Sequence, residues 1–263
     1  MDAMTTHHST PAHARTLVFD FDGTVSLGTG PVLAYARCAA AALSPERAAE
    51  FLVAVDLALD HAPSGQLPGT GAIDGYDLVR LLSAEYGVDP ATLGGAYLAS
   101  RELLASDDAP VVAPQGLPEF LAFARDHANI VLATNAPDIR VTEAVAALGL
   151  TGLFDAVYTS VGKPGGLDPV LDDWLPAGEL LSIGDVWVND LAPAAARGAL
   201  TALVGSPDAA ASPSYRADHL HELYPVIAAW LESAPEDDHT EDNHTDRTTT
   251  ATTTTMKGST SVL

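Results

Sequence analysis

The segment that most constrains the fold is residues 16–24, with the sequence TLVFDFDGT. It begins with β-branched and aromatic apolar residues, as in a strand buried on both faces, and it ends in the carboxylates Asp20 and Asp22. Ligands of open α/β sheets bind at the carboxyl ends of the strands, so both carboxylates are expected at the floor of a site, where Gly23 lets the chain turn away. Residues two apart in an extended segment point the same way, so the pair could share a cation. An ordinary strand that ends in an Asp-Gly turn is the alternative.

The pattern of the chain after residue 116 favours an α/β fold. Short apolar segments predict strands at 130–133, 156–158, 180–183 and 200–204. Helical patterns separate or follow these strands, at 118–127, at 137–148, in an Ala-rich stretch that ends at Arg197, and at 220–231. Strands that alternate with helices predict a parallel sheet covered by helices on both faces, so we expect a doubly wound, Rossmann-like core.

Residues 28–111 differ from the rest of the chain, because they predict helices and no convincing strand. Helices are expected near 31–43, 45–60, 74–86 and 90–105, with Asp74 and Asp89 at the starts of the last two. This four-helix segment therefore interrupts an α/β core that consists of residues 16–27 and 112–232. A polar leader at 1–15 and an acidic, Thr-rich tail at 233–263 are both expected to be disordered, because they offer little apolar surface to offset the entropy of ordering.

The composition excludes several classes of protein. Hydrophobic residues make up 47% of the chain, which is ample for a core, whereas 35 acidic against 12 basic residues give a net charge of −23. Nucleic acid is therefore not an expected partner, because phosphate backbones need clustered Lys and Arg. The single cysteine, Cys38, excludes an internal disulfide and a Cys-rich metal site. With no signal-peptide pattern and no apolar run of membrane-spanning length, a cytoplasmic protein without membrane contact is expected.

Later strands also end in polar residues, which the sheet would bring to the same edge. These residues are Thr134, Asn135, Lys163, Asp185, Asn189 and Asp190. Several carboxylates with no His or Cys nearby favour a hard cation such as Mg²⁺, which prefers oxygen ligands and substrate phosphate. A hydroxyl and an ammonium group could then hold the remaining phosphoryl oxygens, where charge develops during transfer. The residue types therefore favour phosphoryl chemistry.

Four motifs, in order along the chain, resemble those of the haloacid dehalogenase-like (HAD) superfamily, the aspartate-nucleophile phosphohydrolases. They are DFDGT at 20–24, LATN at 132–135, GKP at 162–164 and GDVWVND at 184–190. The resemblance covers residues 16 to about 204 and implies a Rossmann-like core with a helical cap inserted after the first motif. The four-helix segment at 28–111 occupies the position of that cap, which closes over the site and selects the substrate.

The resemblance also implies a role for each motif residue. Asp20 is the expected nucleophile, which attacks phosphorus and forms an aspartyl-phosphate, and Asp22 is the expected acid and base. Thr134, together with the backbone amide of Asn135, is expected to hold the phosphoryl group of the substrate. Lys163 is expected to steady Asp20 and the charge in transfer.

For the metal, the resemblance implies Mg²⁺ bound by Asp185, a carboxylate oxygen of Asp20 and the backbone carbonyl of Asp22. Asp190 and its neighbour Asn189 are expected to support the metal or the active-site lysine from behind these ligands. Helix capping is an alternative role for Asn189 and Asp190. Mn²⁺ or Co²⁺ in place of Mg²⁺ also stays open, because oxygen ligands alone do not distinguish these ions.

Asp22 favours a phosphatase or phosphomutase, because the first motifs of the dehalogenases and phosphonate-cleaving enzymes of this superfamily lack that second Asp. The leading hypothesis is a Mg-dependent phosphatase, monomeric or dimeric, that acts on a small phosphorylated metabolite. A sugar-phosphate mutase is the second hypothesis, and a non-catalytic binding or regulatory protein on the same fold is the third. The basic residues of the cap are candidates for contacting a substrate carboxylate or second phosphate, or else are solvated residues of helix faces. They are Arg37, Arg47, Arg80 and Arg101.

Overall fold

The computed structural model describes residues 6–8, 11–60, 71–205 and 208–234. By its contacts the chain divides into a unit Met1–Ser233, which contains the fold, and a unit Ala234–Leu263. The tail at 233–263 that we expected to be disordered lies outside the described residues, apart from its first two positions. Among the helices of the described residues, none has both the length and the apolar character needed to cross a membrane.

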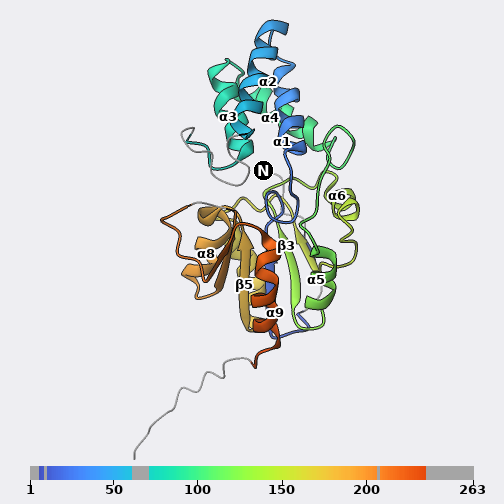
Figure 1. Ribbon diagram of the computed structural model, residues 1–263, viewed down its shortest axis with the longest axis vertical. Helices are drawn as coiled ribbons and strands as arrows, with labels where there is room; N and C mark the ends of the chain where they lie inside the picture. Colours follow the sequence, from blue (N-terminus) through green and yellow to red (C-terminus); the bar gives the residue numbers. More distant parts are fainter. Residues whose placement is uncertain (1–5, 9–10, 61–70, 206–207, 235–263) are drawn as a thin grey trace, which may run out of the picture. The chain divides into compact units, whose positions relative to one another are not determined.

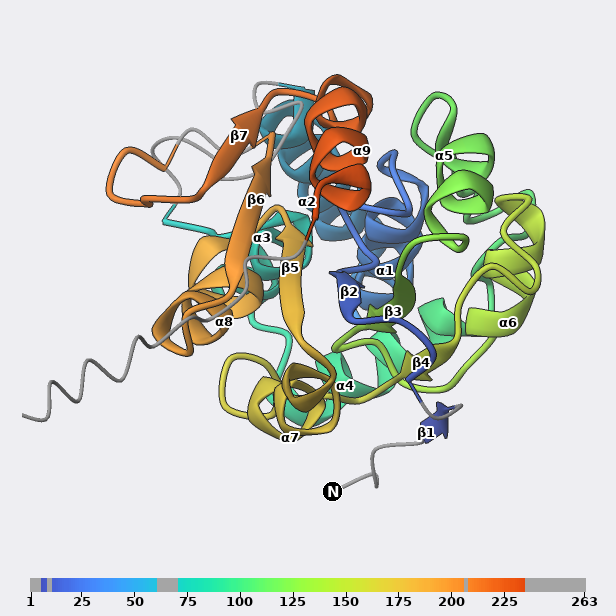
Figure 2. The same cartoon turned by 90° about the horizontal axis from the view of Figure 1, so that it is seen from below.

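A seven-stranded sheet, part of which is labelled in Figure 1, forms the α/β core of the first unit. Its strand order is β1-β4-β3-β2-β5-β6-β7, as labelled in Figure 2. The strands are β1 (Thr6–His8), β2 (Arg15–Phe19), β3 (Asn129–Ala133), β4 (Ala156–Tyr158), β5 (Glu179–Gly184), β6 (Leu200–Val204) and β7 (Tyr215–Ala217). Neighbouring strands from β4 to β7 are parallel, whereas β1 runs antiparallel to β4. The expected doubly wound parallel sheet is confirmed, and its strand order reverses between β2 and β5.

Helices cover both faces of the sheet, because each central strand is apolar on both sides. Leu17 and Phe19 of β2 pack with α5 (Leu117–Ala124), α6 (Val141–Ala147) and α9 (Tyr224–Glu232). Val18, which points to the other face, packs with α7 (Leu167–Trp174) and α8 (Ala192–Ala196). Figure 2 shows the two groups of helices on opposite sides of the strands. The continuous apolar pattern of β2 thus indicates the two-sided burial that a parallel sheet requires.

The inserted segment forms the four helices that the sequence predicts, with a core of its own. They are α1 (Gly30–Ala40), α2 (Pro45–Asp60), α3 (Gly75–Glu85) and α4 (Pro90–Arg101), and we call them the cap. Phe51, Val55 and Leu78 are buried between the helices. Asp74 caps α3 and Asp89 caps α4, each by accepting backbone N–H groups of the first turn.

The cap joins the core through two segments that pair with each other. The N–H of Leu27 donates to the carbonyl of Val112 at 2.8 Å, and the N–H of Val112 donates back at 3.2 Å. These two residues lie next to the boundaries that the sequence predicts for the insertion, residues 28 and 111. These paired connections therefore link the apolar core of the cap to the apolar core around the sheet.

Several elements differ from the sequence-based expectations. The closing helix at 220–231 is divided into a 3₁₀ turn, η3 (Leu220–Leu223), and α9, which starts with a proline in its first turn. A second 3₁₀ turn, η1 (Leu175–Ala177), follows α7, and a π-helical turn, η2 (Trp187–Leu191), precedes α8. α7 and β7 were not predicted, because β7 is only three residues long and α7 is a short segment between two glycines and a proline.

The leader at 1–15 is not wholly disordered as predicted. Thr6–His8 pair with Ala156–Tyr158 as strand β1, and the backbone N–H groups of Ala12 and His13 donate to the side chain of Asn129. The physical reason is that β4 would otherwise be an open edge with unpaired N–H and C=O groups, which an added strand satisfies. Residues 1–5 and 9–10 of the leader lie outside the described residues.

Candidate active site

The floor of the site lies where the strand order reverses, between β2 and β5. The N–H of Asp20, directly after β2, donates to the carbonyl of Ile183 in β5 at 2.9 Å, which fixes the two strand ends side by side. Asp185 follows β5. Gly23 turns with φ +91°, and a Cβ at this position would lie 2.3 Å from Oδ2 of Asp185. Both the backbone angle and the close approach of Asp185 therefore require glycine in this turn.

Lys163 links two carboxylates of the site. Its Nζ lies 2.5 Å from Oδ1 of Asp20 and 2.6 Å from Oδ1 of Asp190, and its side chain is only 3% exposed. The N–H of Val186 donates to the other oxygen of Asp190 at 2.9 Å, which orients that carboxylate. The backbone N–H of Lys163 donates to Oδ1 of Asn135 at 2.7 Å. The ammonium group is therefore held in place from both ends of the residue.

Burial and charge shift the pKa values of these groups. Burial raises the pKa of Asp20 to about 7, although the adjacent Lys163 ammonium opposes this shift. Burial alone would lower the pKa of Lys163, but the carboxylates of Asp20 and Asp190 raise it above its ordinary value. Burial also raises the pKa of Asp185 well above the ordinary range, and the charge of Asp20 adds to this effect. One ammonium group does not balance these carboxylates, so a bound cation would stabilise their charged forms.

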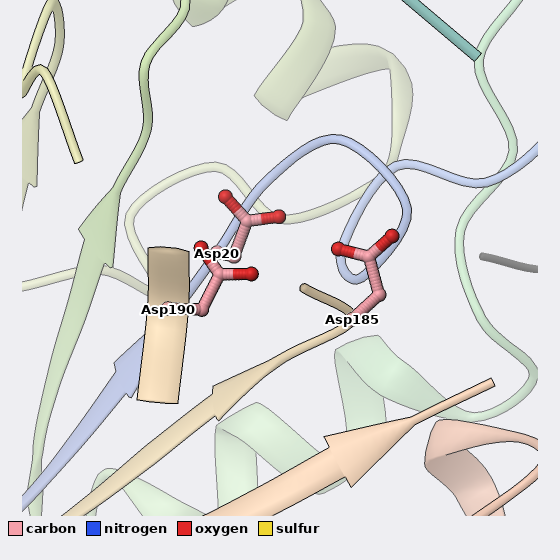
Figure 3. Close-up of side chains that lie close together, drawn as sticks. All are labelled: Asp20, Asp185 and Asp190. Carbon is pink, nitrogen blue, oxygen red and sulfur yellow. The ribbon is translucent and has the colours of Figure 1, made fainter. Parts of the chain in front are cut away.

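Three carboxylates lie close enough to share a metal ion. One oxygen each of Asp20, Asp185 and Asp190 lies within 4.8 Å of the others, and Figure 3 shows Asp20 and Asp190 side by side with Asp185 next to them. No group in the described part of the chain donates a hydrogen bond to the carboxylate of Asp185. Three carboxylates that share one ammonium group fit a hard divalent ion such as Mg²⁺, which would supply the missing positive charge. The side chain of Asp22 lies outside this group, so a contribution of Asp22 to a metal falls to its backbone carbonyl.

Thr134 and Asn135 follow β3 and line the same cavity as the carboxylates. Oγ1 of the buried Thr134 accepts a hydrogen bond from the N–H of Ala136 at 3.0 Å, so its own hydrogen is left to donate to a ligand. The exposed Asn135 holds the backbone of Lys163 with its side chain. The sequence did not predict this side-chain contact, because it depends on how closely the segments after β3 and β4 approach each other.

Asp22 is held by the cap, whereas Asp20 is held by the core. Tyr76 of α3 donates its hydroxyl to Oδ1 of Asp22 at 3.0 Å. Nη1 of Arg101, at the end of α4, lies 3.4 Å from Oδ2 of Asp22 and donates to the Tyr76 hydroxyl at 2.9 Å. The Arg101 side chain is 1% exposed, and within the described residues its Nε and Nη2 have no hydrogen-bond partner. Two cap residues therefore hold the carboxylate of the expected acid and base.

Sequence reasoning did not identify Tyr76 and left Arg101 among four alternatives. One signal for Arg101 was available, because it lies eight residues after Leu93 and five after Ala96, on the face of α4 that is buried. An arginine on a buried helix face needs a charged partner, and here that partner is Asp22. By contrast, Arg37, Arg47 and Arg80 are exposed, as residues of solvated helix faces would be, although Arg80 also lines the cavity described below. Nothing in the local sequence indicates the contact of Tyr76.

Helix capping by Asn189 and Asp190, the alternative role for these residues, is not observed. Neither η2 nor α8 has a side-chain cap, and the Asp190 carboxylate instead binds Lys163 and the N–H of Val186. Asn189 lines the cavity. A Cβ on Gly184 would lie 2.4 Å from Cβ of Asp190, so the end of β5 must be glycine to let Asp190 approach.

A cavity of about 350 Å³ extends from these carboxylates to the cap. Its core wall is formed by Asp20, Asp22, Thr134, Asn135, Ala136, Lys163, Asp185, Val186, Asn189 and Asp190. Its cap wall is formed by Tyr35, Ile73, Asp74, Tyr76, Asp77, Arg80 and Tyr97. The volume is at the lower end for a small-molecule site, where pockets start at about 300 Å³.

No protein-family model and no curated protein matches the chain in sequence. Solved structures do match its fold. YfnB of Bacillus subtilis, named as a HAD-hydrolase and bound to magnesium, has a TM-score of 0.54 at 21% identity, over 82% of this chain and 99% of that chain. A Clostridium difficile protein named as a phosphatase has a TM-score of 0.55 at 15% identity, over 81% of this chain and 97% of that chain.

A third structure, from Thermotoga maritima and named as a β-phosphoglucomutase, has a TM-score of 0.51 at 14% identity, over 82% of this chain and 99% of that chain. The chain therefore has the fold of HAD-superfamily hydrolases, phosphatases and mutases, which confirms the fold that the four motifs implied. At these identities the likeness concerns the fold, so the reaction has to be argued from the site.

Proposed function

We propose that the chain is a metal-dependent phosphatase that cleaves small phosphate monoesters through an aspartyl-phosphate on Asp20. The observation that carries this proposal is the Lys163 ammonium group between Asp20 and Asp190, with Asp185 within metal-sharing distance. A carboxylate beside a fixed positive charge, at the reversal point of a doubly wound sheet, is suited to attack a phosphoryl group whose charge must be stabilised.

In the first step, an oxygen of Asp20 attacks phosphorus, the bond from phosphorus to the alcohol oxygen breaks, and that oxygen takes a proton from Asp22. In the second step, Asp22 takes a proton from water, which attacks the aspartyl-phosphate and releases phosphate and Asp20. The different surroundings of the two residues support this division, because Asp20 is paired with Lys163 whereas Asp22 is 24% exposed beside the cavity. Asp22 can therefore exchange protons with ligand and solvent.

The other residues of the core wall would bind the phosphoryl group. The Thr134 hydroxyl can donate one hydrogen bond to it, and Lys163 offers a positive charge that is already oriented by two carboxylates. These groups require no rearrangement when charge moves onto the phosphoryl oxygens, which is the main source of electrostatic catalysis. A divalent cation held by Asp20, Asp185 and the backbone of Asp22 would add positive charge to the same oxygens.

The test is phosphate release by the purified full chain from a panel of small phosphomonoesters and an aryl phosphate, with Mg²⁺ and then with a chelator. We expect release that depends on Mg²⁺ and disappears in the Asp20→Asn variant. No release with any ester at several Mg²⁺, Mn²⁺ and Co²⁺ concentrations would contradict the proposal and favour a binding role.

The same assay separates hydrolysis from the mutase alternative. A mutase moves phosphate within a sugar phosphate and releases little of it, so its product has to be followed by isomer analysis and not by free phosphate. Isomerisation of a hexose phosphate faster than phosphate release would replace the phosphatase proposal with a mutase that uses the same Asp20.

A further inference from the structure

The cap wall of the cavity has a composition that restricts the substrate. The phosphoryl group of an ester bound at Asp20 leaves the alcohol part of the molecule to face the cap wall, since core and cap walls enclose the same cavity. Three tyrosines on this wall pack together, with ring centroids 5.5 Å apart for Tyr35 and Tyr97 and 6.0 Å apart for Tyr76 and Tyr97. The alcohol therefore meets aromatic surface together with the charged groups of α3.

Among the described residues that line the cavity, every basic side chain is already paired. Both carboxylate partners of Lys163 lie within 2.6 Å of its ammonium group. Arg80 lies 2.7 Å from Oδ1 of Asp77, which it contacts through Nε and Nη2. Arg101 is buried against Asp22 and does not line the cavity. Among the described residues, the charged groups of the cap wall are therefore two carboxylates, Asp74 and Asp77, and one guanidinium group that already binds Asp77, and this excess of negative charge disfavours a second phosphate or a carboxylate on the alcohol.

Asp74, on the same wall, is a carboxylate without a cation. It accepts the backbone N–H of Asp77 at 2.7 Å, and no basic side chain of the described residues forms an ion pair with it. Burial raises the pKa of Asp74, which means that its charge is insufficiently compensated, although the N–H of Asp77 opposes the shift. A positively charged group in the cavity would stabilise this charge, and tyrosine rings attract the same kind of group.

We propose, on the basis of the proposed phosphatase function, that the substrates are phosphate monoesters of amino alcohols, with the ammonium group bound at Asp74 and the tyrosines of the cap wall. The site then selects against esters whose alcohol carries a carboxylate or a second phosphate. Selection of this kind arises because a negative group on the substrate would lie against the carboxylate of Asp74. Repulsion between like charges lowers the rate for such esters by orders of magnitude.

Three esters of similar size test the charge preference, because they differ mainly in the group at the end of a two-carbon alcohol. They are 2-aminoethyl phosphate, 2-hydroxyethyl phosphate and phosphoglycolate, which are positive, neutral and negative at that end. We expect kcat/KM to be about tenfold higher for the amino ester than for the hydroxy ester, and at least about 100-fold higher than for phosphoglycolate. An aryl phosphate is assayed in parallel as a measure of phosphatase activity.

Two matched variants test whether Asp74 binds the ammonium group of the substrate. Asp74→Asn keeps an N-cap for α3, because Asn caps about as well as Asp, and removes the charge. We expect it to lower the ratio of amino to hydroxy ester turnover about tenfold. Asp89→Asn makes the same change at the N-cap of α4, which is exposed and does not line the cavity, and should leave the ratio unchanged.

The outcomes separate this inference from the proposed function. Turnover of the aryl phosphate together with equal or better turnover of phosphoglycolate, or an unchanged ratio in Asp74→Asn, overturns the amino-alcohol assignment and leaves the phosphatase proposal standing. If no phosphate is released from the aryl phosphate or from any of the three esters, the phosphatase proposal itself is overturned. If kcat/KM follows the expected order of the three esters, and this order is lost in Asp74→Asn but kept in Asp89→Asn, both the amino-alcohol assignment and the phosphatase proposal are supported.

Discussion

The two walls of the cavity hold their carboxylates in different ways. On the core wall, Asp20 binds Lys163, whose ammonium group is fixed by Asp190 and whose backbone is fixed by Asn135. Asp22, only two residues away, turns to the cap, where Tyr76 and the buried Arg101 bind it. One strand end therefore supplies a carboxylate to each side of the cavity.

This difference shows which parts of the site depend on the position of the cap. The contacts of Asp20 come from segments that follow strands of one sheet, so they do not depend on the cap. The contacts of Asp22 exist only while the cap lies over the core, because both partners belong to cap helices. The acid and base of the proposed reaction is thus positioned by cap residues, and the nucleophile by core residues.

The largest effect is expected for Asp20→Asn. The change is nearly isosteric but removes the nucleophilic oxygen, so phosphate release should fall at least about a thousandfold. The melting temperature should not fall, since the substitution also removes a buried charge whose pKa is raised by burial. Steady-state phosphate release and circular dichroism melting measure both quantities. Wild-type turnover in this variant would exclude Asp20 as the nucleophile.

A large effect on both activity and stability is expected for Lys163→Met. Removing the ammonium group leaves the buried carboxylates of Asp20 and Asp190 without a cation, which should cost about 3 kcal/mol of unfolding free energy at pH 8 and more than a hundredfold in turnover. Urea denaturation with and without Mg²⁺ measures the first quantity. Mg²⁺ should restore part of the stability but not the activity, because the metal replaces only the charge. A stable and active variant would contradict the assigned role of Lys163.

The matched change on the cap wall, Arg101→Met, should affect activity without reducing stability. Within the described residues two nitrogens of the buried Arg101 lack hydrogen-bond partners, and water can solvate the Asp22 carboxylate, which is 24% exposed, so an apolar side chain of similar length should fold at least as well. Turnover of alkyl phosphates should fall about 10- to 100-fold, because Asp22 loses its orientation as proton donor. In Tyr76→Phe, which removes the hydroxyl that binds Asp22, turnover of alkyl phosphates should fall about tenfold.

The leaving group provides the control for this prediction. An aryl oxide needs little protonation when it leaves, so initial release of the phenol from an aryl phosphate should be affected less than turnover of an alkyl phosphate. Equal losses with both esters, or a loss of stability like that of Lys163→Met, would mean that the core and cap walls do not differ in the proposed way.

The sequence predicted the core wall better than the cap wall, for a physical reason. Asp20, Asp185 and Asp190 follow short apolar segments, and parallel strands bring their carboxyl ends to one edge whatever the loops do. Tyr76 and Arg101 meet Asp22 only through the packing of two helices over the core. Such contacts depend on tertiary structure, which local patterns do not encode.

The same reasoning explains the errors in the fold. The strand β1 was predicted as disordered because polar residues such as those of 6–8 gain order only from the open edge of β4. The start of α6 at Val141, where 137 was expected, follows from the left-handed backbone of Arg140 at φ 55°, which local composition does not indicate. Cap helices α3 and α4 were placed correctly within a few residues because their Asp caps are strong local signals.

The smallest effect, a pH-dependent stabilisation by Mg²⁺, tests the core wall without relying on activity. In the folded chain burial raises the pKa of Asp20 to about 7, from about 4 for a free carboxyl group. The folded protein without metal therefore binds a proton that the unfolded chain has lost, and its stability falls as the pH rises from about 4 to about 7. Mg²⁺ competes with that proton, so its stabilising effect should grow across the same range. A gain of about 1 kcal/mol corresponds to roughly 2–4 °C in melting temperature for a domain of this size.

We expect Mg²⁺, compared with chelator, to raise the melting temperature by a few degrees at pH 8 and by much less at pH 5. The shift should disappear in Asp185→Asn, which removes a carboxylate of the three-residue group, and should persist in Asp74→Asn, which changes a carboxylate of the cap wall. An equal shift at both pH values would mean that the ion binds to carboxylates elsewhere on this acidic chain. A shift that depends on Asp74 and not on Asp185 would place the metal on the cap wall and reverse the comparison between the two walls.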